Sequence, residues 1–230
     1  MTGTTERSRP RVGLAPAEWR QSRYWDRRYR ADPTFFGAGR SAFLGWLLAA
    51  VRDRPVGRTW LELGSGYGRD LRVLRREGYR VRGIDVSSVG TAIARKRGLA
   101  AARADALSFL RAQSPRSFDV VFSNLFYNME FTAADHERLF SLVYRVLVPG
   151  GYHTYSVRSV SDPWFGKGTK VGPATYDLGP DGPVMHFFSN AYARRLRRGR
   201  FRSVRSWEGD EDQGDFPIRV LYMLDRKSRG

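Results

Sequence analysis

The chain has 230 residues, enough for one domain with a substantial core and too few for two full domains. It contains no cysteine, which excludes disulfides, thiolate catalysis and zinc–thiolate sites, and no apolar run approaches the ~20 residues of a membrane span. The formal net charge of +17 would suit nucleic acid as a partner, but only four of the 40 basic residues are lysine, and so large an arginine excess resembles the coding bias of a GC-rich, bacterial genome.

The N-terminal quarter predicts a tail followed by a helical cap. Residues 1–15 are polar and carry arginines with no apolar stretch after them, so they predict a disordered tail rather than a secretory signal. We therefore expect a cytoplasmic protein. Residues 17–52 place aromatic and aliphatic side chains at helical spacing on either side of two glycines. These aromatic residues either close over a ligand or only cover the edge of a sheet.

The most informative segment is Leu-Glu-Leu-Gly-Ser-Gly-Tyr-Gly-Arg-Asp at 61–70, between a predicted strand and a predicted helix. Gly64, Gly66 and Gly68 require a tight turn and let a ligand approach the main chain closely. A dinucleotide fingerprint would have its third glycine at position 69, which is Arg69. Glu62, two residues before the first glycine, would repel a pyrophosphate and would suit a cationic ligand.

Two further predicted strands end in an acid. Residues 80–87 predict a second strand with an acid, Asp85, at its end. Its distance along the chain from the glycine motif is close to the ~20-residue separation at which an acid meets a ribose in βαβ nucleotide sites. A carboxylate accepts two hydrogen bonds from a cis-diol, which explains the residue type. Residues 101–106 predict a short strand that ends at Asp105. The alternative role of both acids is that of a helix N-cap or turn residue.

The elements that follow continue the alternation of strands and helices. Residues 117–125 predict a strand that runs into Asn-Leu-Phe-Tyr, and Pro-Gly-Gly at 149–151 turns into another at 152–157. Helices are predicted at 69–77, 89–97 and 133–146. Such alternation predicts right-handed crossovers and a parallel sheet. The last two strands, at 203–207 and 218–224, have no helix between them and predict an antiparallel hairpin.

In these motifs the sequence resembles the class I S-adenosylmethionine-dependent methyltransferases, whose first motif is acid-x-Gly-x-Gly-x-Gly. The resemblance runs from about Tyr24 to the C-terminus. It implies a Rossmann-like, doubly wound α/β fold over residues 16–230 as a single domain, with a seven-stranded sheet that is mostly parallel and has an antiparallel last strand. Segments 124–129, 164–169 and 186–189 further resemble a small-molecule subgroup similar to the tellurite-resistance methyltransferases.

The resemblance also implies a cofactor site for S-adenosylmethionine, with S-adenosylhomocysteine as the product. Glu62 would hold the methionine amino group directly or through water, Asp85 the ribose and Asp105 the adenine. The expected cofactor-binding residues are Tyr24, Glu62, Gly64, Ser65, Gly66, Gly68, Asp85, Val86, Asp105, Ala106, Asn124 and Leu125. No metal is expected, because the three histidines are scattered along the chain.

Two residues are candidates for catalysis. Methyl transfer is an in-line displacement, for which an enzyme supplies proximity, alignment and sometimes a base. His186 is the best candidate base, because it can titrate near neutral pH, although it can equally be a hydrogen-bonded strand histidine. Tyr127 either orients a nucleophile or is a packed aromatic. We expect His153 to be structural and His136 to be solvated.

An enclosed pocket for a small, aromatic or amphipathic metabolite is expected. The Gly/Pro-rich segment 161–183 is long for a structureless connection and predicts a lid-like insertion over the pocket. The expected acceptor-binding residues are Trp25, Tyr29, Phe36, Asn128, Arg158 and Trp164. Asn-Leu-Phe-Tyr at 124–127 lacks the two prolines of enzymes that methylate exocyclic base nitrogens, which argues against that reaction.

Two alternatives remain open. An RNA- or protein-modifying methyltransferase would be favoured if the arginine-rich segment 194–205, on a predicted helix at 189–199 and the next strand, borders the pocket. We expect that segment to be a solvated face, because the acidic residues at 208–215 predict a loop that would repel phosphate. The second alternative is an S-adenosylmethionine-binding protein with a non-methylating reaction such as cyclisation, or with none. Nucleic acid and membrane are not expected partners, and we expect a monomer or homodimer.

Overall fold

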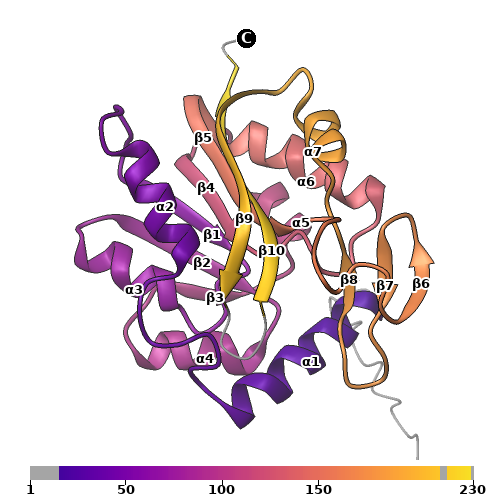
Figure 1. The fold of residues 1–230 in the computed structure, drawn as a ribbon. Coiled ribbons are helices and arrows are strands. Elements are labelled where there is room, and N and C mark those ends of the chain that lie inside the picture. Colours follow the sequence, from indigo (N-terminus) through magenta and orange to yellow (C-terminus); the bar gives the residue numbers. More distant parts are fainter. Residues whose placement is uncertain (1–15, 213–216, 229–230) are drawn as a thin grey trace, which may run out of the picture.

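The computed structural model describes residues 16–212 and 217–228, so the tail predicted for residues 1–15 lies outside the described residues. Seven strands form one sheet in the order β3-β2-β1-β4-β5-β10-β9 (Figure 1). These strands are β1 (Thr59–Leu63), β2 (Arg80–Asp85), β3 (Ala101–Arg103), β4 (Phe118–Asn124), β5 (Leu147–Arg158), β9 (Phe201–Asp212) and β10 (Pro217–Lys227). The predicted seven-stranded α/β sheet is therefore confirmed.

Strands β1 to β5 run parallel, whereas β10 is antiparallel to both of its neighbours, β5 and β9. The helices are α1 (Pro16–Ala31), α2 (Ala42–Val51), α3 (Arg69–Arg76), α4 (Ser88–Lys96), α5 (Ala106–Ala112), α6 (Ala133–Val146) and α7 (Asn190–Arg197). Helices α3 to α6 each connect two parallel strands, as a parallel sheet requires. The chain order reverses between β1 and β4, which makes this point the crevice where such sheets bind ligands.

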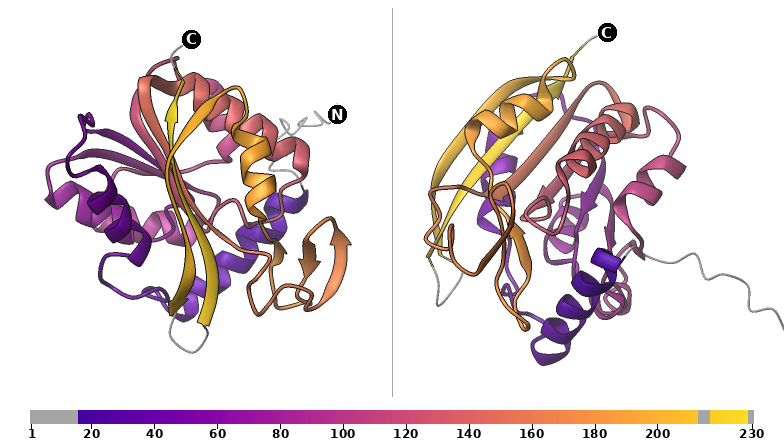
Figure 2. Two further views of the ribbon diagram at one scale, coloured as in Figure 1. Left: turned by 45° about the horizontal axis from the view of Figure 1, so that its top comes forward. Right: turned by 90° about the vertical axis from the view of Figure 1, so that its right-hand side faces the viewer.

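The two faces of the sheet carry separate apolar clusters. Trp60 of β1 packs on one face with Phe43 and Leu47 of α2, whereas Leu61 faces the cluster that α5, α6 and α7 cover. The alternation follows from strand geometry, in which successive side chains point to opposite faces. Helices therefore flank both faces (Figure 2). Glu62 shares the face of Trp60 and lies next to the carboxyl end of β1.

The closing hairpin is longer than predicted and includes residues that we expected in an acidic loop. Strand β9 continues to Asp212 because β10, which begins at Pro217, pairs with it along its whole length. The Glu211 carboxylate is buried and accepts a hydrogen bond from Tyr222 Oη. The prediction of a loop was therefore wrong for residues 208–212, and Asp215 lies outside the described residues.

The two helices of segment 17–52 occupy different places. Helix α2 packs against the sheet, and its first residue follows Ser41, whose Oγ caps the helix by accepting from Leu44 N at 2.9 Å. Ser41 in turn donates from its N and Oγ to the Asp70 carboxylate of α3, at 2.9 and 2.6 Å. Helix α1 instead lies across the carboxyl end of the sheet (Figure 1).

The segment 161–183 contains regular structure of its own. Strands β6 (Thr169–Gly172) and β7 (Thr175–Asp177) pair antiparallel, and β7 also pairs with β8 (Val184–His186). This small sheet lies beside α1 (Figures 1 and 2), and Arg20 of α1 forms an ion pair with Asp177 of β7 at 2.7 Å. Within residues 16–212 and 217–228, no helix has the length and apolar character that crossing a bilayer needs.

Candidate functional site

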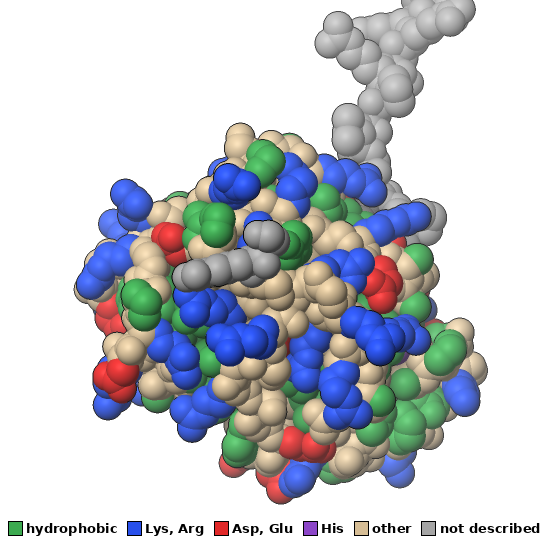
Figure 3. Space-filling view, turned by 90° about the horizontal axis from the view of Figure 1, so that it is seen from above, with side chains coloured by type: hydrophobic (Ala, Val, Ile, Leu, Met, Phe, Trp, Pro, Cys, Tyr) green, Lys and Arg blue, Asp and Glu red, His purple; other side chains and the backbone are tan. Residues whose placement is uncertain are grey.

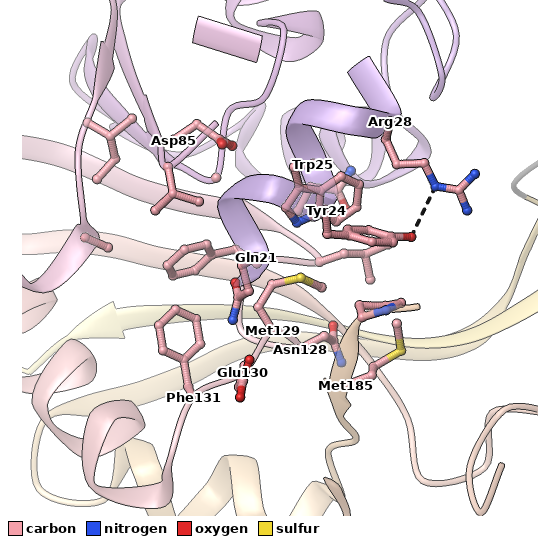
Figure 4. A pocket seen from close by; sticks show the side chains of 18 of the residues that line it. Gln21, Tyr24, Trp25, Arg28, Asp85, Asn128, Met129, Glu130, Phe131 and Met185 are labelled. Atoms are coloured by element: carbon pink, nitrogen blue, oxygen red, sulfur yellow. Dashed lines mark hydrogen bonds between the residues drawn. The ribbon is translucent and has the colours of Figure 1, made fainter. Parts of the chain in front are cut away.

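A pocket of about 350 Å³ opens at the carboxyl ends of β1, β2 and β4 (Figure 4). One side of its lining comes from the ends of β1, β2 and β3, and includes Glu62, Asp85 and Asp105. The other side comes from α1, from the loop after β4 at residues 124–131, and from residues in and next to the small sheet, namely Trp164, Pro183 and Met185. One cavity therefore joins the predicted cofactor residues to the predicted acceptor residues.

The loop between β1 and α3 depends on glycine at alternate positions. Gly64, Gly66 and Gly68 have φ values of +74°, +51° and +77°, in the left-handed region that side chains disfavour. Gly64 lines the pocket, and a Cβ on it would lie 2.9 Å from the Phe126 ring. At Gly68 a Cβ would lie 2.6 Å from Leu99 Cδ1. The third glycine therefore serves the packing of α3 and α4 and does not line the pocket.

The middle glycine is where α1 meets the loop. The space that a Cβ of Gly66 would need is taken by the Tyr29 hydroxyl, and the Tyr29 ring lies 2.9 Å from the position of a Cβ on Gly90. Tyr29 is buried, and its burial raises the pKa of the phenol well above the ordinary value. We predicted Tyr29 as an acceptor residue, and it lines the pocket while it also joins the cap helix to the glycine loop.

Two carboxyl groups are buried beside the glycine loop. Asp85 Oδ2 accepts from Gly66 N at 2.8 Å and Oδ1 accepts from Ser87 N at 2.7 Å, and burial raises the pKa of Asp85 to about 6. Glu62 is 3% exposed, and its Oε2 has no hydrogen-bond partner among the described residues. Burial, followed by the proximity of Asp70, raises the pKa of Glu62 well above its usual range.

The other predicted cofactor residues lie at the ends of β3 and β4. Asp105 caps α5 by accepting from Ser108 N at 2.7 Å, and its side chain also lines the pocket. Leu125 adopts a φ of +55°, and its N donates to Ser156 Oγ at 2.9 Å. A left-handed residue other than glycine persists only where its surroundings hold it, and such positions cluster at ligand sites. Tyr24, Val86, Ala106 and Asn124 also line the pocket, whereas Ser65 and Gly66 do not.

Aromatic side chains line the part of the pocket that is next to α1. Trp25 stacks on Tyr29 with ring centroids 5.8 Å apart and lies 5.9 Å from Phe36. Arg28 Nε donates to Tyr24 Oη at 3.2 Å (Figure 4). Sequence reasoning missed further lining residues, among them Gln21, Met129, Glu130, Phe131 and Met185. Residues 129–131 follow directly after the predicted Asn128, and this adjacency was the signal in the sequence that could have revealed them.

Asn128 and Arg158 support the wall of the pocket as well as lining it. Asn128 Nδ2 donates to the His186 carbonyl at 2.7 Å, and its Oδ1 accepts from Arg158 N at 2.9 Å. The Arg158 guanidinium makes a bidentate pair with Asp162, with both contacts at 2.9 Å, and lies over the Trp164 ring at 5.1 Å. Bidentate pairing fixes the orientation of Arg158 and with it the place of Trp164.

The two predicted catalytic residues are not part of the lining. Tyr127 is fully buried, its Oη lies 3.0 Å from His153 Nε2, and burial raises the pKa of the phenol. His186 Nδ1 lies 2.8 Å from Thr175 Oγ1, and burial lowers the pKa of His186 to about 4. His186 is thus a hydrogen-bonded strand histidine in this structure, and a catalytic role for either residue stays a prediction.

The remaining histidines are both buried. His153 lies in the core, as its predicted structural role requires. The prediction that His136 is solvated was wrong, because Nδ1 lies 2.8 Å from Tyr192 Oη and Nε2 lies 2.9 Å from the Tyr127 carbonyl. The loop after β4 and α7 cover this face of α6, which the helical periodicity could not reveal. In the described part of the chain, no group of His, Asp or Glu side chains is placed to hold a metal ion.

The pocket is acidic although the chain is strongly basic. Its charged lining residues are Glu62, Asp70, Asp85, Asp105, Glu130 and Asp135, against Arg28, Arg69 and Arg158. Lysine and arginine side chains spread instead over the end of the molecule that is uppermost in Figure 1 and faces the viewer in Figure 3, opposite α1. The arginines of segment 194–205 all lie in described positions and do not line the pocket.

Comparison with known proteins agrees with this geometry. Residues 61–154 match the family model described as a methyltransferase domain. Similar solved structures include an S-adenosylmethionine-dependent methyltransferase from Methanosarcina mazei, which is 19% identical over 74% of this chain and 92% of its own, with a TM-score of 0.66. No curated protein sequence matches this chain.

Two other similar structures cover nearly the whole chain. The 1,6-didemethyltoxoflavin-N1-methyltransferase of Burkholderia thailandensis, solved with 1,6-didemethyltoxoflavin and S-adenosylhomocysteine, is 20% identical over 95% of this chain and 93% of its own, with a TM-score of 0.65. The (4+2)-cyclase SpnF is 18% identical over 94% and 98%, with a TM-score of 0.68. At such identities the likeness establishes the fold.

The fold is thus that of the class I S-adenosylmethionine-dependent methyltransferases. Together with the methyltransferase domain at residues 61–154, it identifies the protein as a methyltransferase enzyme whose cofactor is S-adenosylmethionine and whose cofactor product is S-adenosylhomocysteine.

Proposed function

We propose that the protein transfers the methyl group of S-adenosylmethionine to an O, N or C atom of a small, aromatic or amphipathic acceptor. The observation that carries the proposal is the continuity of the pocket, which joins the motif acids to the aromatic residues under α1. Its volume of about 350 Å³ lies within the ~300–1,000 Å³ range of small-molecule sites. The ion pair of Arg20 with Asp177 also ties α1 to the small sheet, which favours an enclosed acceptor over a macromolecule.

The residues present fit the cofactor. Glu62 is a buried carboxyl group whose Oε2 has no partner among the described residues, and the cofactor's ammonium group would supply the missing counter-charge. Each Asp85 oxygen accepts one backbone hydrogen bond and keeps capacity for a ribose hydroxyl. Asp105 would take the adenine amino group. The cofactor supplies an electrophilic methyl group on a sulfonium sulfur.

The chain itself would supply alignment and exclusion of water. The faces of Tyr24 and Trp25 line the cavity, so they would keep a cationic cofactor and an apolar acceptor in contact and away from solvent. We propose that His186 contributes through its main chain, because Asn128 Nδ2 donates to the His186 carbonyl and Asn128 Oδ1 accepts from Arg158 N at the pocket wall. Tyr127 would hold the loop after β4 in place from the side that faces away from the pocket. Both are positioning roles.

Calorimetric titration with S-adenosylmethionine and S-adenosylhomocysteine, on the natural chain and on Asp85→Asn, tests the cofactor site. Transfer of a labelled methyl group to metabolites of an extract tests the acceptor class. We expect micromolar binding of both cofactor forms, weakened in the variant, and label in small molecules. Label in RNA or protein but not in small molecules would contradict the proposal.

A second candidate is an S-adenosylmethionine-binding enzyme with a non-methylating reaction such as cyclisation. It is favoured by the absence of histidine and lysine from the lining that the described residues form, so that a base for methyl transfer would have to be one of the carboxylates that bind the ligands. The fold likeness to a (4+2)-cyclase is consistent with it. Formation of S-adenosylhomocysteine during turnover of an extract would decide for methyl transfer, whereas conversion of a metabolite with the cofactor recovered intact would decide for the second candidate. A tellurite-resistance type of activity and a cytoplasmic location stay predictions.

A further inference from the structure

Glu130 is a carboxylate that the cofactor does not account for. It lies in the loop after β4 and lines the pocket, whereas the acids expected to hold the cofactor lie at the ends of β1, β2 and β3. Figure 4 shows Glu130 beside Met129 and Phe131, well separated from Asp85 across the view of the pocket. Glu130 therefore belongs to the acceptor side of the cavity.

The hydrogen-bond capacity of Glu130 is not satisfied by the protein. Its Oε2 is buried and has no hydrogen-bond partner among the described residues. Arg20, a described cation whose charge acts on Glu130, is already paired with Asp177 at 2.7 Å. Asp135, the other acid on this side, is held by the amide and hydroxyl of Thr132, at 3.1 and 2.6 Å. Glu130 is thus left with a negative charge at the wall of the cavity and with a buried carboxylate oxygen that no described residue satisfies.

Apolar and aromatic side chains predominate around Glu130, and Gln21 and Asn128 are the polar residues that Figure 4 labels in this part of the pocket. Met129, Phe131 and Met185 line the same part of the pocket, and Tyr24 and Trp25 face it from α1 (Figure 4). Partial burial raises the pKa of Glu130, while the charge of Arg20 lowers it. A carboxyl group in such surroundings is stabilised in its ionised form by a cation, and aromatic faces also attract cations.

We propose that Glu130 binds the acceptor, and that it selects molecules in which a protonated amine is carried on a small aromatic or apolar body. The inference rests on the proposed function, because it takes the cavity beyond the cofactor residues to be the acceptor site. Glu130 acts as an anchor for the ammonium group, which leaves the atom that receives the methyl group to be set by the rest of the molecule. An acceptor with a carboxylate at the same place is rejected, because two like charges would meet with little water between them.

Three phenols of similar size and different charge test the proposal. Tyramine carries an ammonium group, 4-ethylphenol is neutral, and 3-(4-hydroxyphenyl)propanoate is anionic. Each is titrated calorimetrically into the full chain saturated with S-adenosylhomocysteine. We expect tyramine to bind most tightly and the anion most weakly. The ranking is measured on the natural chain and so needs no variant.

The variant Glu130→Gln keeps the shape of the side chain and removes its charge. We expect it to weaken tyramine binding roughly tenfold to hundredfold, as for the loss of a hydrogen bond to a charged group, and to leave 4-ethylphenol within about twofold. Glu77→Gln is the matched control, since it removes the same charge from an exposed position outside the pocket. The affinity of the Glu130→Gln variant for S-adenosylhomocysteine shows that its fold is intact.

The outcomes distinguish a failure of the proposed function from a failure of the inference about Glu130. If the natural chain does not bind S-adenosylhomocysteine, the proposed function fails. If it does bind the cofactor but binds none of the three phenols, prefers the neutral or anionic one, or keeps its preference for tyramine in Glu130→Gln, the inference about Glu130 is overturned and the proposed function stands.

Discussion

The two sides of the pocket are built in different ways. On the cofactor side, Glu62, Gly64 and Asp85 stand at the ends of neighbouring strands, and main-chain groups such as Gly66 N fix their geometry. On the acceptor side, Trp25 and Glu130 come from segments far apart in sequence, and side chains make most of the surface. The cofactor side can therefore stay constant while the acceptor side changes, because only the former is tied to the strands of the sheet.

The two sides also differ in how their carboxyl groups are buried. Glu62 is almost inaccessible, whereas Glu130 is only half-buried and lies near a paired arginine. Burial raises the pKa of both groups, so a cationic ligand would relieve an unfavourable state of the free protein on either side. The relief is greater where burial is deeper. Among the changes that affect binding, we expect Asp85→Asn on the cofactor side to have the largest effect.

The largest effect is expected for Asp85→Asn. The amide keeps the shape but cannot accept from both Gly66 N and Ser87 N and also from a ribose. Loss of hydrogen bonds to a charged group should weaken S-adenosylhomocysteine binding by at least about 100-fold. Calorimetry measures the affinity, and circular dichroism shows whether the fold survives. Unchanged affinity in a folded variant would remove Asp85 from the cofactor site.

Gly66→Ala tests the place where the two sides meet. The added Cβ is strained at a φ of +51° and collides with the Tyr29 hydroxyl, so we expect a loss of about 2 kcal/mol in the free energy of unfolding. Tyr29→Phe removes the hydroxyl and should restore part of this loss. Urea unfolding of both single variants and the double variant gives the coupling. Effects that add within about 0.5 kcal/mol would show that the two residues do not interact.

Glu62→Gln should weaken cofactor binding less than Asp85→Asn does. It should also stabilise the folded protein, whereas Gly66→Ala destabilises it. We expect about tenfold weaker S-adenosylhomocysteine binding, the scale of one charge-assisted hydrogen bond. Because the Glu62 pKa is raised in the folded protein, its contribution to stability is present at low pH and is lost as pH rises through that pKa. The variant should therefore unfold at a higher temperature than the natural chain at pH 8.

The pH dependence of binding checks the same assignment. A bound ammonium group favours the carboxylate form of Glu62, so affinity in the natural chain should increase as pH rises across the raised pKa. The Glu62→Gln variant should keep only the slope that comes from Asp85, whose pKa is raised to about 6. Equal slopes in both proteins, measured by calorimetry at several pH values, would count against Glu62.

The smallest effect is expected for Arg20→Ala at the contact between α1 and the small sheet. The Arg20 and Asp177 side chains are 38% and 26% exposed, so their ion pair should contribute less than about 0.5 kcal/mol to stability. The variant removes a positive charge near Glu130, and we expect tyramine to bind about twofold more tightly by the same scale of surface electrostatics. Weaker tyramine binding would contradict the placement of Glu130 in the acceptor site.

The sequence by itself determined the sheet, the glycine loop and the acids that follow successive strands. Gly64, Asp85 and Asp105 are recognisable because each stands at the end of a βα unit, where local spacing sets its place at the edge of a parallel sheet. The lack of a predicted helix between the last two strands likewise predicted the closing antiparallel hairpin, although not its length, because β9 extends only as far as β10 pairs with it.

Tertiary structure decided which other side chains complete the pocket and which candidates stay out of it. His136 has a polar sequence neighbourhood, but the loop after β4 and α7 bury it. Tyr127 and His186 have suitable chemistry, but packing turns both away from the cavity. Glu130 was overlooked because its only local signal, its place two residues after the predicted Asn128, does not distinguish it from a solvated acid. Its environment arises only where α1, the loop after β4 and the small sheet converge, and such long-range contacts leave no periodic signal in the chain.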